Sequence, residues 1–261
     1  MAGGSGVMYE VAAPLVSRRE VARDMCVLGF QAAPIAQSVR AGQFVNLLLR
    51  PGPLLRRPFS VYRADGDVIE IVLKAVGDGT QRLLELTEGD LVSALGPLGR
   101  GFQLDAAMRH VTLVSGGLGV APMPLAARDA RALGLGVTWV HGARTRAELC
   151  SEADADHLRW ATDDGSLGVH GSALDAVPLD DVGQVLACGP NRMLAAVATC
   201  WPEAQVAIET YMGCGTGVCL GCAVPRTSGF YDRACTEGPV YRADSIRWVG
   251  LPAHLHYRVA V

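Results

Sequence analysis

Positive charge is scarce in this sequence. Its 261 residues include 23 lysines and arginines against 26 aspartates and glutamates, which gives a formal net charge of −3. Nucleic acids and anionic lipids are bound by basic surfaces, which this balance does not supply. We therefore expect no nucleic-acid partner, and a small molecule or another protein fits the composition better.

Apolar runs of the kind that enter membranes are also lacking. The first eight residues contain no charged segment followed by an apolar one, so no secretory signal is expected and the protein is predicted to be cytoplasmic. Residues 111–127 are uncharged, but glycines and prolines interrupt them. A strand, a loop and a helix start are expected there, and no membrane span.

Disorder is not expected, because half of the residues are apolar and only 19% are charged. The length allows two globular domains and a small appendage. The 31 glycines gather in short clusters, where the backbone must turn tightly or approach a ligand closely. Cofactors are the ligands that such clusters suggest.

Residues 1–106 are predicted to form an antiparallel β-barrel. Short strands are expected at 7–16, 24–29, 43–49, 59–63, 68–76 and 91–95. A strand about every ten residues, with turns between, is typical of a small barrel. Gly89-Asp90 and Gly96-Pro-Leu-Gly99 are expected to form its last turns.

Residues 107–208 are predicted to form a doubly wound α/β domain with a parallel sheet. Buried strands are expected at 111–115, 136–141 and 184–188, and helices at 122–133 and 192–201. Alternation of strands and helices is the pattern of this fold. Residues 209–261 are then expected to form a small C-terminal domain, rich in cysteine and glycine, with a tail.

Four of the eight cysteines carry the strongest chemical signal. Cys214, Cys219 and Cys222 have the C-x4-C-x2-C spacing of plant-type 2Fe-2S sites, and Cys235 follows after twelve intervening residues. The glycines between them let three thiolates approach two irons from one loop, and leave N–H groups free to bond to sulfur. One 2Fe-2S cluster is the predicted occupant.

A four-cysteine zinc site is the alternative, although such sites generally use two C-x2-C pairs rather than a clustered triplet. In that case the chain is a zinc-stabilised binding module without redox activity. The remaining cysteines show no ligand spacing among themselves, and Cys26, Cys150 and Cys200 are expected to be small core residues.

Two segments of the barrel region have residues suited to a flavin. Arg57-Pro-Phe-Ser60 places a guanidinium, an aromatic ring and a hydroxyl at a strand start, a useful set for a pyrophosphate and an isoalloxazine. Lys74-Ala-Val-Gly77-Asp-Gly79-Thr80 could bind phosphate oxygens at a helix start, or could be an ordinary hairpin exit. Either segment alone is weak evidence for a flavin site.

Two segments of the α/β region suit a dinucleotide. Gly116-Gly-Leu-Gly119-Val-Ala-Pro122 follows a buried strand and opens a helix, where N–H groups can hold a pyrophosphate, although it departs from G-x-G-x-x-G. Cys188-Gly189-Pro190 ends a later strand at the edge where ligands of such sheets bind, so Cys188 could lie against a nicotinamide. Taken singly, that tripeptide is also an ordinary turn.

In this order, the four segments resemble the ferredoxin-NADP reductase superfamily over about residues 7–205. With the C-terminal cysteines and Cys235-Thr-Glu-Gly-Pro-Val240, nearly the whole chain is similar to the electron-transfer subunits of dihydroorotate dehydrogenase B. The resemblance implies an FAD barrel, an NAD domain and a 2Fe-2S domain.

The resemblance also implies which residues bind each group. The FAD residues are Arg57, Pro58, Phe59, Ser60, Val72, Leu73, Lys74, Gly79 and Thr80. The NAD residues are Gly116, Gly117, Gly119, Pro122, Cys188, Gly189 and Pro190. The cluster ligands are Cys214, Cys219, Cys222 and Cys235. NAD is an exchangeable substrate, whereas FAD and the cluster are resident.

A partner follows from the same resemblance. In that family an FMN-containing catalytic subunit oxidises dihydroorotate in pyrimidine biosynthesis, and electrons pass through the cluster and FAD to NAD+; a heterotetramer of two subunits of each kind is implied. FAD is the required converter, because nicotinamide accepts two electrons as hydride and the cluster carries one. Flavin and iron-sulfur subunits of NAD(P)-linked ferredoxin reductases, sulfide dehydrogenases and hydrogenases share these modules, so that alternative stays open.

Three smaller features leave alternatives open. No acidic residue ends the segment 137–141 to read a ribose 2′-hydroxyl, and Arg144 could meet a 2′-phosphate, so NAD rather than NADP rests on the resemblance. Asp163-Asp164-Gly165 is either a nucleotide-side turn or a solvated acidic loop. The tail residues could belong to a partner surface, but simple packing is the more common role; they are Trp248, His254, His256 and Tyr257.

Overall fold

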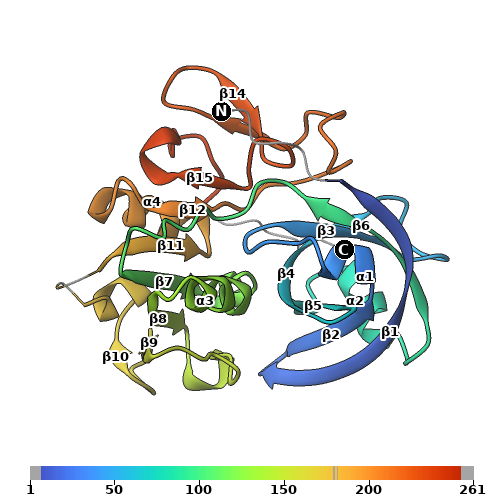
Figure 1. The fold of residues 1–261 in the computed structure, drawn as a ribbon, viewed down its shortest axis with the longest axis horizontal. Helices are drawn as coiled ribbons and strands as arrows, with labels where there is room; N and C mark the ends of the chain where they lie inside the picture. The colour runs from blue at the N-terminus through green and yellow to red at the C-terminus, as the bar shows by residue number, and fades with distance from the viewer. Residues whose placement is uncertain (1–6, 179, 181, 254–261) are drawn as a thin grey trace.

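The computed structural model describes residues 7–178, 180 and 182–253. Figure 1 shows a barrel on one side, a sheet flanked by helices on the other, and a C-terminal segment that lies across the top of both. The fold is therefore a β-barrel, a parallel α/β unit and a small cysteine-bearing unit, as the sequence predicts.

Six antiparallel strands close the barrel in the order β1-β2-β5-β4-β3-β6. They are β1 (Tyr9–Ala22), β2 (Met25–Gln31), β3 (Phe44–Leu48), β4 (Arg57–Asp65), β5 (Val68–Leu73) and β6 (Leu91–Leu98), with the short helices α1 (Ala33–Ala36) and α2 (Asp78–Glu85) between them. Alternate residues of β6 point inward, because successive side chains of a strand lie on opposite faces. The barrel is thus filled by its own side chains.

A seven-stranded sheet forms the second unit, in the order β10-β9-β8-β7-β11-β12-β15. Its strands are β7 (His110–Gly116), β8 (Gly136–Ala143), β9 (His157–Thr162), β10 (Val169–His170), β11 (Gln184–Cys188), β12 (Gln205–Ala207) and β15 (Val240–Arg242), and its helices are α3 (Met123–Ala132) and α4 (Asn191–Cys200). The strands pair in parallel except β15, which runs antiparallel to β12. The central strands are buried on both faces, as in doubly wound folds.

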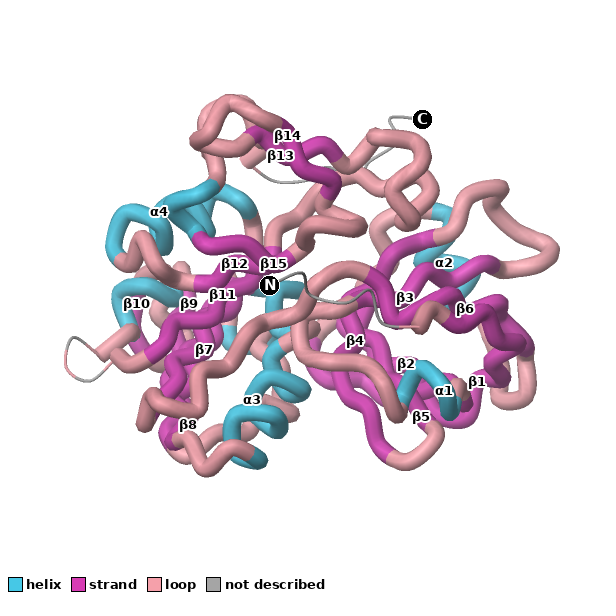
Figure 2. Tube along the Cα trace, turned by 45° about the horizontal axis from the view of Figure 1, so that its top comes forward, coloured by secondary structure: helices cyan, strands magenta, loops and turns pink. Residues whose placement is uncertain are grey.

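The C-terminal segment is less separate than the expected division at residue 209 suggests. It contributes the hairpin of β13 (Ala223–Pro225) and β14 (Tyr231–Arg233), and then returns so that β15 becomes an edge strand of the α/β sheet. Figure 2 shows β15 beside β12 while β13 and β14 stand apart. The cysteine-bearing loop is therefore anchored to the α/β unit on its C-terminal side.

Several expected elements differ from the observed ones. β1 continues through Arg18 and Arg19 to Ala22, because this stretch pairs with β2, Arg18 with Leu28 and Arg19 with Val27. The segment from Gly96 is not a turn, since β6 runs to Leu98 and pairs there with β3. Cys26 and Cys150 are buried as expected, but Cys200 is exposed at the end of α4, so its assignment to the core was wrong.

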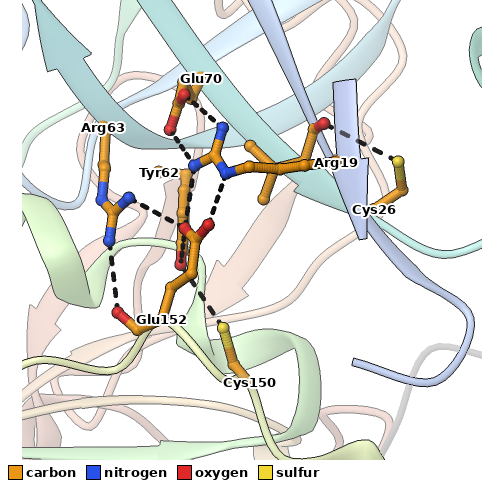
Figure 3. Close-up of polar contacts among 8 residues, drawn as sticks. Arg19, Cys26, Tyr62, Arg63, Glu70, Cys150 and Glu152 are labelled. Carbon is orange, nitrogen blue, oxygen red and sulfur yellow. Dashed lines mark hydrogen bonds and ion pairs between the residues drawn. The ribbon is translucent and has the colours of Figure 1, made fainter. Parts of the chain in front are cut away.

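An ionic junction binds the barrel to the α/β unit (Figure 3). We use this name for Arg19, Tyr62, Arg63, Glu70 and Glu152. The Arg19 guanidinium donates to both carboxylates: to Glu70 at 2.6 and 2.7 Å, and to Glu152 through Nε and Nη2. Arg63 also donates to Glu152, at 2.9 Å, and the Tyr62 hydroxyl donates to it at 3.2 Å. One carboxylate from the α/β unit thus accepts bonds from two barrel strands.

Within the described residues, no helix is both long and apolar enough to cross a membrane. Trp248 packs against buried apolar residues that include Val206 and Val224, and its indole N–H donates to the Ala243 carbonyl at 3.1 Å, which agrees with a packing role. His254, His256 and Tyr257 lie outside the described residues.

Candidate flavin, nucleotide and iron-sulfur sites

The four predicted cluster ligands lie together in the C-terminal unit, arranged as two pairs. The Sγ atoms of Cys222 and Cys235 are 3.3 Å apart. Cys214 and Cys219 each donate a backbone N–H to the other's sulfur at 3.4 Å. Two pairs of thiols are what two irons need, because each tetrahedral iron takes two thiolates besides the two bridging sulfides.

Backbone N–H groups surround these sulfurs. Besides the reciprocal pair, Thr216 donates to Cys214 at 3.4 Å and Gly217 donates to Cys235 at 3.1 Å. Burial raises the pKa of the Cys214 thiol, but the N–H groups of Cys219 and Thr216 outweigh it and lower that pKa to about 6. These bonds favour thiolates, which are the form that binds iron.

The zinc alternative requires a tighter arrangement. Four thiolates must converge on one tetrahedral ion at about 2.3 Å. Among the described residues, no three histidine, cysteine, aspartate or glutamate side chains converge closely enough to hold a single metal ion. The arrangement of the four thiols as two pairs accords with a binuclear cluster.

The two predicted FAD segments meet on the barrel. β4 begins at Arg57, and a Cβ placed on Gly79 would lie 2.9 Å from Arg57 Nε, so the guanidinium packs directly against the start of α2. The Thr80 hydroxyl already accepts N–H bonds from Val76 and Gly77 and donates to the Gly77 carbonyl. Thr80 therefore shapes the turn, and the guanidinium is the better placed of the two groups to meet a phosphate.

Val72 and Leu73 end β5 next to this turn, and Lys74 follows the strand. Val72 and Leu73 are buried in the barrel, whereas Lys74 is half-buried. Contact between a flavin and the first two would thus be through their backbone.

The two predicted NAD segments also meet. A Cβ on Gly119 would lie 2.0 Å from the carbonyl oxygen of Cys188, a distance that no side chain tolerates. Gly116 and Gly189 both pack against Met193 of α4, at 2.8 and 2.7 Å from their own hypothetical Cβ atoms. Gly117, with φ +54°, has no such neighbour within 4 Å. The two turns form one surface, at the carboxyl edge where doubly wound sheets bind ligands.

Pro122 and Pro190 complete these turns at helix starts. Pro122 precedes α3 and Pro190 precedes α4. Both helices therefore direct their N-termini toward the glycine turns, which is the polarity that favours an anion.

A cavity of about 140 Å³ brings the flavin and nucleotide segments together. Its walls include Pro58 and Ser60 from β4, Gly119 and Cys188 from the nucleotide turns, and Glu209 with Met212 from the segment that leads to the cysteines. Sites for whole drug-sized ligands measure about 300–1,000 Å³. Its size therefore suits the meeting point of two rings rather than a whole dinucleotide.

Glu209 is the acidic residue of this cavity, and the sequence pattern missed it. It follows β12 closely, and the carboxyl ends of strands are where such residues gather. Its backbone is fixed by Asn191, whose Nδ2 donates to the Glu209 carbonyl at 3.0 Å while Oδ1 accepts the Glu209 N–H at 3.2 Å. Burial, and then the Glu209 charge, raise the pKa of the Cys188 thiol, so Cys188 stays neutral beside the cavity.

A larger groove of about 1920 Å³ lies elsewhere, between the barrel, the α/β unit and the far side of the cysteine loop. Gln43, Arg100, Gln205 and Tyr241 are among its walls, and Cys235 is the one residue from the predicted sites that it touches. It contains none of the predicted FAD or NAD residues, so the smaller cavity is the candidate redox site.

At the expected ribose end, Arg144 is not free. It follows β8 and donates to both carboxylate oxygens of Glu148, at 3.1 and 2.8 Å. This ion pair raises the pKa of the Arg144 guanidinium. Asp164 accepts bonds from Ser166 within its own loop, and Asp163 bonds through its backbone N–H to the Ala143 carbonyl. The acidic turn therefore lies beside the end of β8.

Comparison with protein families and structures gives consistent results. Residues 209–247 match the family model described as the iron-sulfur cluster binding domain of dihydroorotate dehydrogenase B. The dihydroorotate dehydrogenase B (NAD(+)) electron transfer subunit of Geobacillus thermodenitrificans is 36% identical over 248 residues, which is 89% of this chain and 96% of that protein. The subunit of the same name from Clostridium acetobutylicum is 36% identical over 78% of this chain and 84% of its own length.

Two solved structures share the fold. A chain of the NADH-dependent reduced ferredoxin-NADP oxidoreductase superposes with a TM-score of 0.81 at 27% identity, over 95% of this chain and 92% of its own. Phthalate dioxygenase reductase superposes with a TM-score of 0.60 at 18% identity, over 84% and 87%. The second likeness is one of fold alone.

Proposed function

The chain belongs to the family of dihydroorotate dehydrogenase B electron transfer subunits, and on that premise we propose that it passes electrons from a catalytic partner through one 2Fe-2S cluster and FAD to NAD+. The observation that carries the proposal is the small cavity where Ser60, Cys188 and Met212 meet. It joins the flavin segment, the nicotinamide segment and the start of the cysteine loop.

FAD and NAD are proposed to meet in this cavity. When bound, FAD supplies the conversion between a two-electron hydride and single electrons. The residues proposed to hold it are those of Arg57 to Ser60, Val72 to Lys74, Gly79 and Thr80, with the Arg57 guanidinium on phosphate. On the other wall, Gly116, Gly117, Gly119 and the Cys188-Gly189-Pro190 turn are proposed to receive the nucleotide, because their bare backbone lets it approach closely.

The cluster is proposed to bind to the two thiol pairs, with Cys214 and Cys219 on one iron and Cys222 and Cys235 on the other. The mutual N–H bonds of the first pair and the 3.3 Å contact of the second support this division. The N–H groups aimed at sulfur would stabilise the negative charge of the bound cluster.

The partner is proposed to be an FMN-containing dihydroorotate dehydrogenase catalytic subunit, in a heterotetramer of two subunits of each kind. The chain would act on dihydroorotate only together with that partner. Exposed apolar residues beside the cluster support docking there: Val218 and Leu220 flank Cys219 and are 81% and 63% exposed. Exposed apolar residues that gather in one place can mark a protein interaction site.

A second function remains supported by one observation. The chain of the NADH-dependent reduced ferredoxin-NADP oxidoreductase matches nearly the whole length of this one. An NAD(P)-linked flavin and iron-sulfur subunit with a different partner is therefore the competing proposal.

Spectroscopy and reconstitution test both proposals. We expect the aerobically purified protein to show flavin and cluster absorption bands, and NADH to bleach them anaerobically in preference to NADPH. Adding an FMN-bearing catalytic subunit should then give dihydroorotate-dependent reduction of NAD+, while ferredoxin should not replace that subunit. A protein with neither chromophore, containing zinc, would refute electron transfer; activity with ferredoxin alone would favour the competing function.

A further inference from the structure

A single amide connects the flavin barrel to the cysteine loop. Asn46 lies in the middle of β3, and its Nδ2 donates to the carbonyl of Cys214 at 3.1 Å. In the antiparallel ladder, Asn46 is the direct partner of Pro58, one of the predicted FAD residues. Only one strand spacing thus separates the candidate flavin segment from the residue that holds the first cluster ligand.

The loop is shaped to receive this amide. A Cβ placed on Gly215 would lie 1.9 Å from Asn46 Nδ2, and Gly215 has φ +73°, a backbone conformation that favours glycine. The side chain of Asn46 therefore fills the space that a side chain at 215 would need. The contact is close on both sides, so the loop cannot shift toward the barrel without displacing the amide.

Packing alone does not explain an amide here. Asn46 is 1% exposed, and its neighbours Val45 and Leu47 on the strand are fully buried apolar residues. Its Oδ1 is buried without a hydrogen-bond partner among the described residues. A buried acceptor in that state costs stability, and an apolar side chain of similar size would avoid the cost. The position therefore carries a constraint other than folding.

We propose that Asn46 is a positioning residue for electron transfer: it holds the Cys214 loop at a fixed distance from the flavin strand, so that it controls exchange between FAD and the cluster but not hydride transfer at the nicotinamide side. The proposal rests on the electron-transfer function proposed above. The amide itself takes no electron.

Two half-reactions separate this role from a general effect. Each NADH supplies two electrons as a hydride; one can pass to the cluster while the other stays on the flavin, so a single turnover needs no external oxidant. In anaerobic rapid mixing with NADH, Asn46→Leu and Asn46→Ser should leave the rate of flavin bleaching within about two-fold of wild type and slow cluster bleaching about ten-fold or more.

The electron paramagnetic resonance spectrum of the reduced cluster supplies a readout independent of activity. We expect it to change in both variants, because the ligand loop loses its anchor, while iron content stays unchanged. Thr112→Val is the matched control: its buried hydroxyl also donates to one distant carbonyl, that of Val182 at 2.6 Å, but within the α/β unit. This control should leave both rates and the resonance spectrum unchanged.

A double-mutant cycle tests the contact from the other side. Gly215→Ala should displace the loop and slow cluster bleaching in the wild-type background. In an Asn46→Ala background the same substitution should slow cluster bleaching by less, because the atom that the new methyl group would strike is gone. Additive effects in the cycle would overturn the proposal, as would wild-type cluster bleaching in the Asn46 variants. If instead the wild-type protein lacks flavin or cluster, the proposed function itself has failed.

Discussion

The barrel meets the rest of the molecule in two different ways. At the ionic junction, Arg19 and Arg63 reach across to the carboxylate of Glu152 through long, charged side chains. At the cysteine loop, the contact is close and involves a glycine: Gly215 lies against Asn46 of the barrel, much as Gly119 lies against Cys188 within the α/β unit. One junction tolerates adjustment of its side chains, whereas the other leaves no room for a single added methyl group.

This difference matches what each junction has to do. Ion pairs hold two units together but can tilt and re-form, since long side chains have many rotamers. Close backbone contact defines positions to a fraction of an ångström, as transfer between bound groups requires. We therefore expect changes at the ionic junction to alter mainly stability, and changes at the close contacts to alter mainly electron transfer.

Loss of a cluster ligand should give the largest effect, because it removes the group that the close contacts position. Cys222→Ser leaves Cys235 without the thiol 3.3 Å away, and a serine hydroxyl is a poor substitute for a thiolate on iron. We expect the cluster bands and the reduction of a one-electron protein acceptor to be lost, about 100-fold or more, with flavin reduction by NADH retained. Cys200→Ser, which changes an exposed cysteine, is the control; cluster bands that survive in Cys222→Ser would contradict the ligand assignment.

Gly119→Ala tests the close contact on the nucleotide side. The added methyl group would meet the Cys188 carbonyl at 2.0 Å, so the two turns must move apart at a cost of about 1–3 kcal/mol in the free energy of unfolding. We expect NADH-driven flavin reduction to fall at least about ten-fold, with flavin content unchanged. Gly117→Ala has open space around it and, despite φ +54°, should cost only about 1 kcal/mol. Equal effects of the two substitutions on the rate of flavin reduction would show that the contact of Gly119 with Cys188 does not control that rate.

The fold could largely be predicted because its determinants are local. The alternation of β6 and the apolar runs of β7 and β11 are visible in a few residues each, and β11 begins and ends at the predicted positions, 184 and 188. β15 could not be predicted, because Val240–Arg242 is a strand only by virtue of pairing with β12. The extension of β6 past Gly96 depends on β3 in the same way.

The residues of the candidate site were likewise predictable only where a local sequence pattern marks them. Glycine and cysteine patterns identify the turns, since close approach and metal ligation demand those residue types at fixed spacings. Glu209 and Asn46 lie outside any such pattern, and only the fold brings them to Cys188 and Cys214. The ionic junction is equally invisible in the sequence, since Arg19 and Glu152 are separated by 133 residues.

Glu152→Gln tests the ionic junction. Removing this charge leaves Arg19 and Arg63 with one carboxylate fewer, and we expect a loss of about 2 kcal/mol in the free energy of unfolding. The rates of flavin and cluster bleaching should stay within about two-fold of wild type, because the cavity walls do not include this residue. Denaturant titration and rapid mixing measure the two quantities. A large change in rate without a change in stability would reverse the proposed division between the junctions.

The same variant has a defined pH dependence. Hydrogen bonds from Arg19, and then the Arg19 and Arg63 charges, hold the pKa of Glu152 below its usual value of 4.5 despite burial. A carboxylate with a lowered pKa stabilises the fold fully above the unfolded pKa, and this contribution is lost as pH falls through the folded pKa. The stability gap between wild type and Glu152→Gln should therefore be constant at about pH 6–8 and narrow below pH 4.5. A gap that widens on acidification would rule out the ion pairs as its source.

The smallest effect is expected where an ion pair lies near the nucleotide itself. Arg144 is paired with Glu148, which weakens its attraction for a 2′-phosphate, and this accords with use of NAD by the family. In Glu148→Gln the amide cannot neutralise the guanidinium, and a phosphate becomes its better partner. We expect kcat/KM for NADPH to rise about three-fold to ten-fold while that for NADH is unchanged. Arg144→Ala/Glu148→Gln should abolish the gain, since the phosphate then has no cation to meet; a gain that persists in the double variant would show that Arg144 does not lie at the ribose. The ion pair of Arg144 with Glu148 would then select between two nucleotides, whereas the ion pairs of the ionic junction only hold two units together.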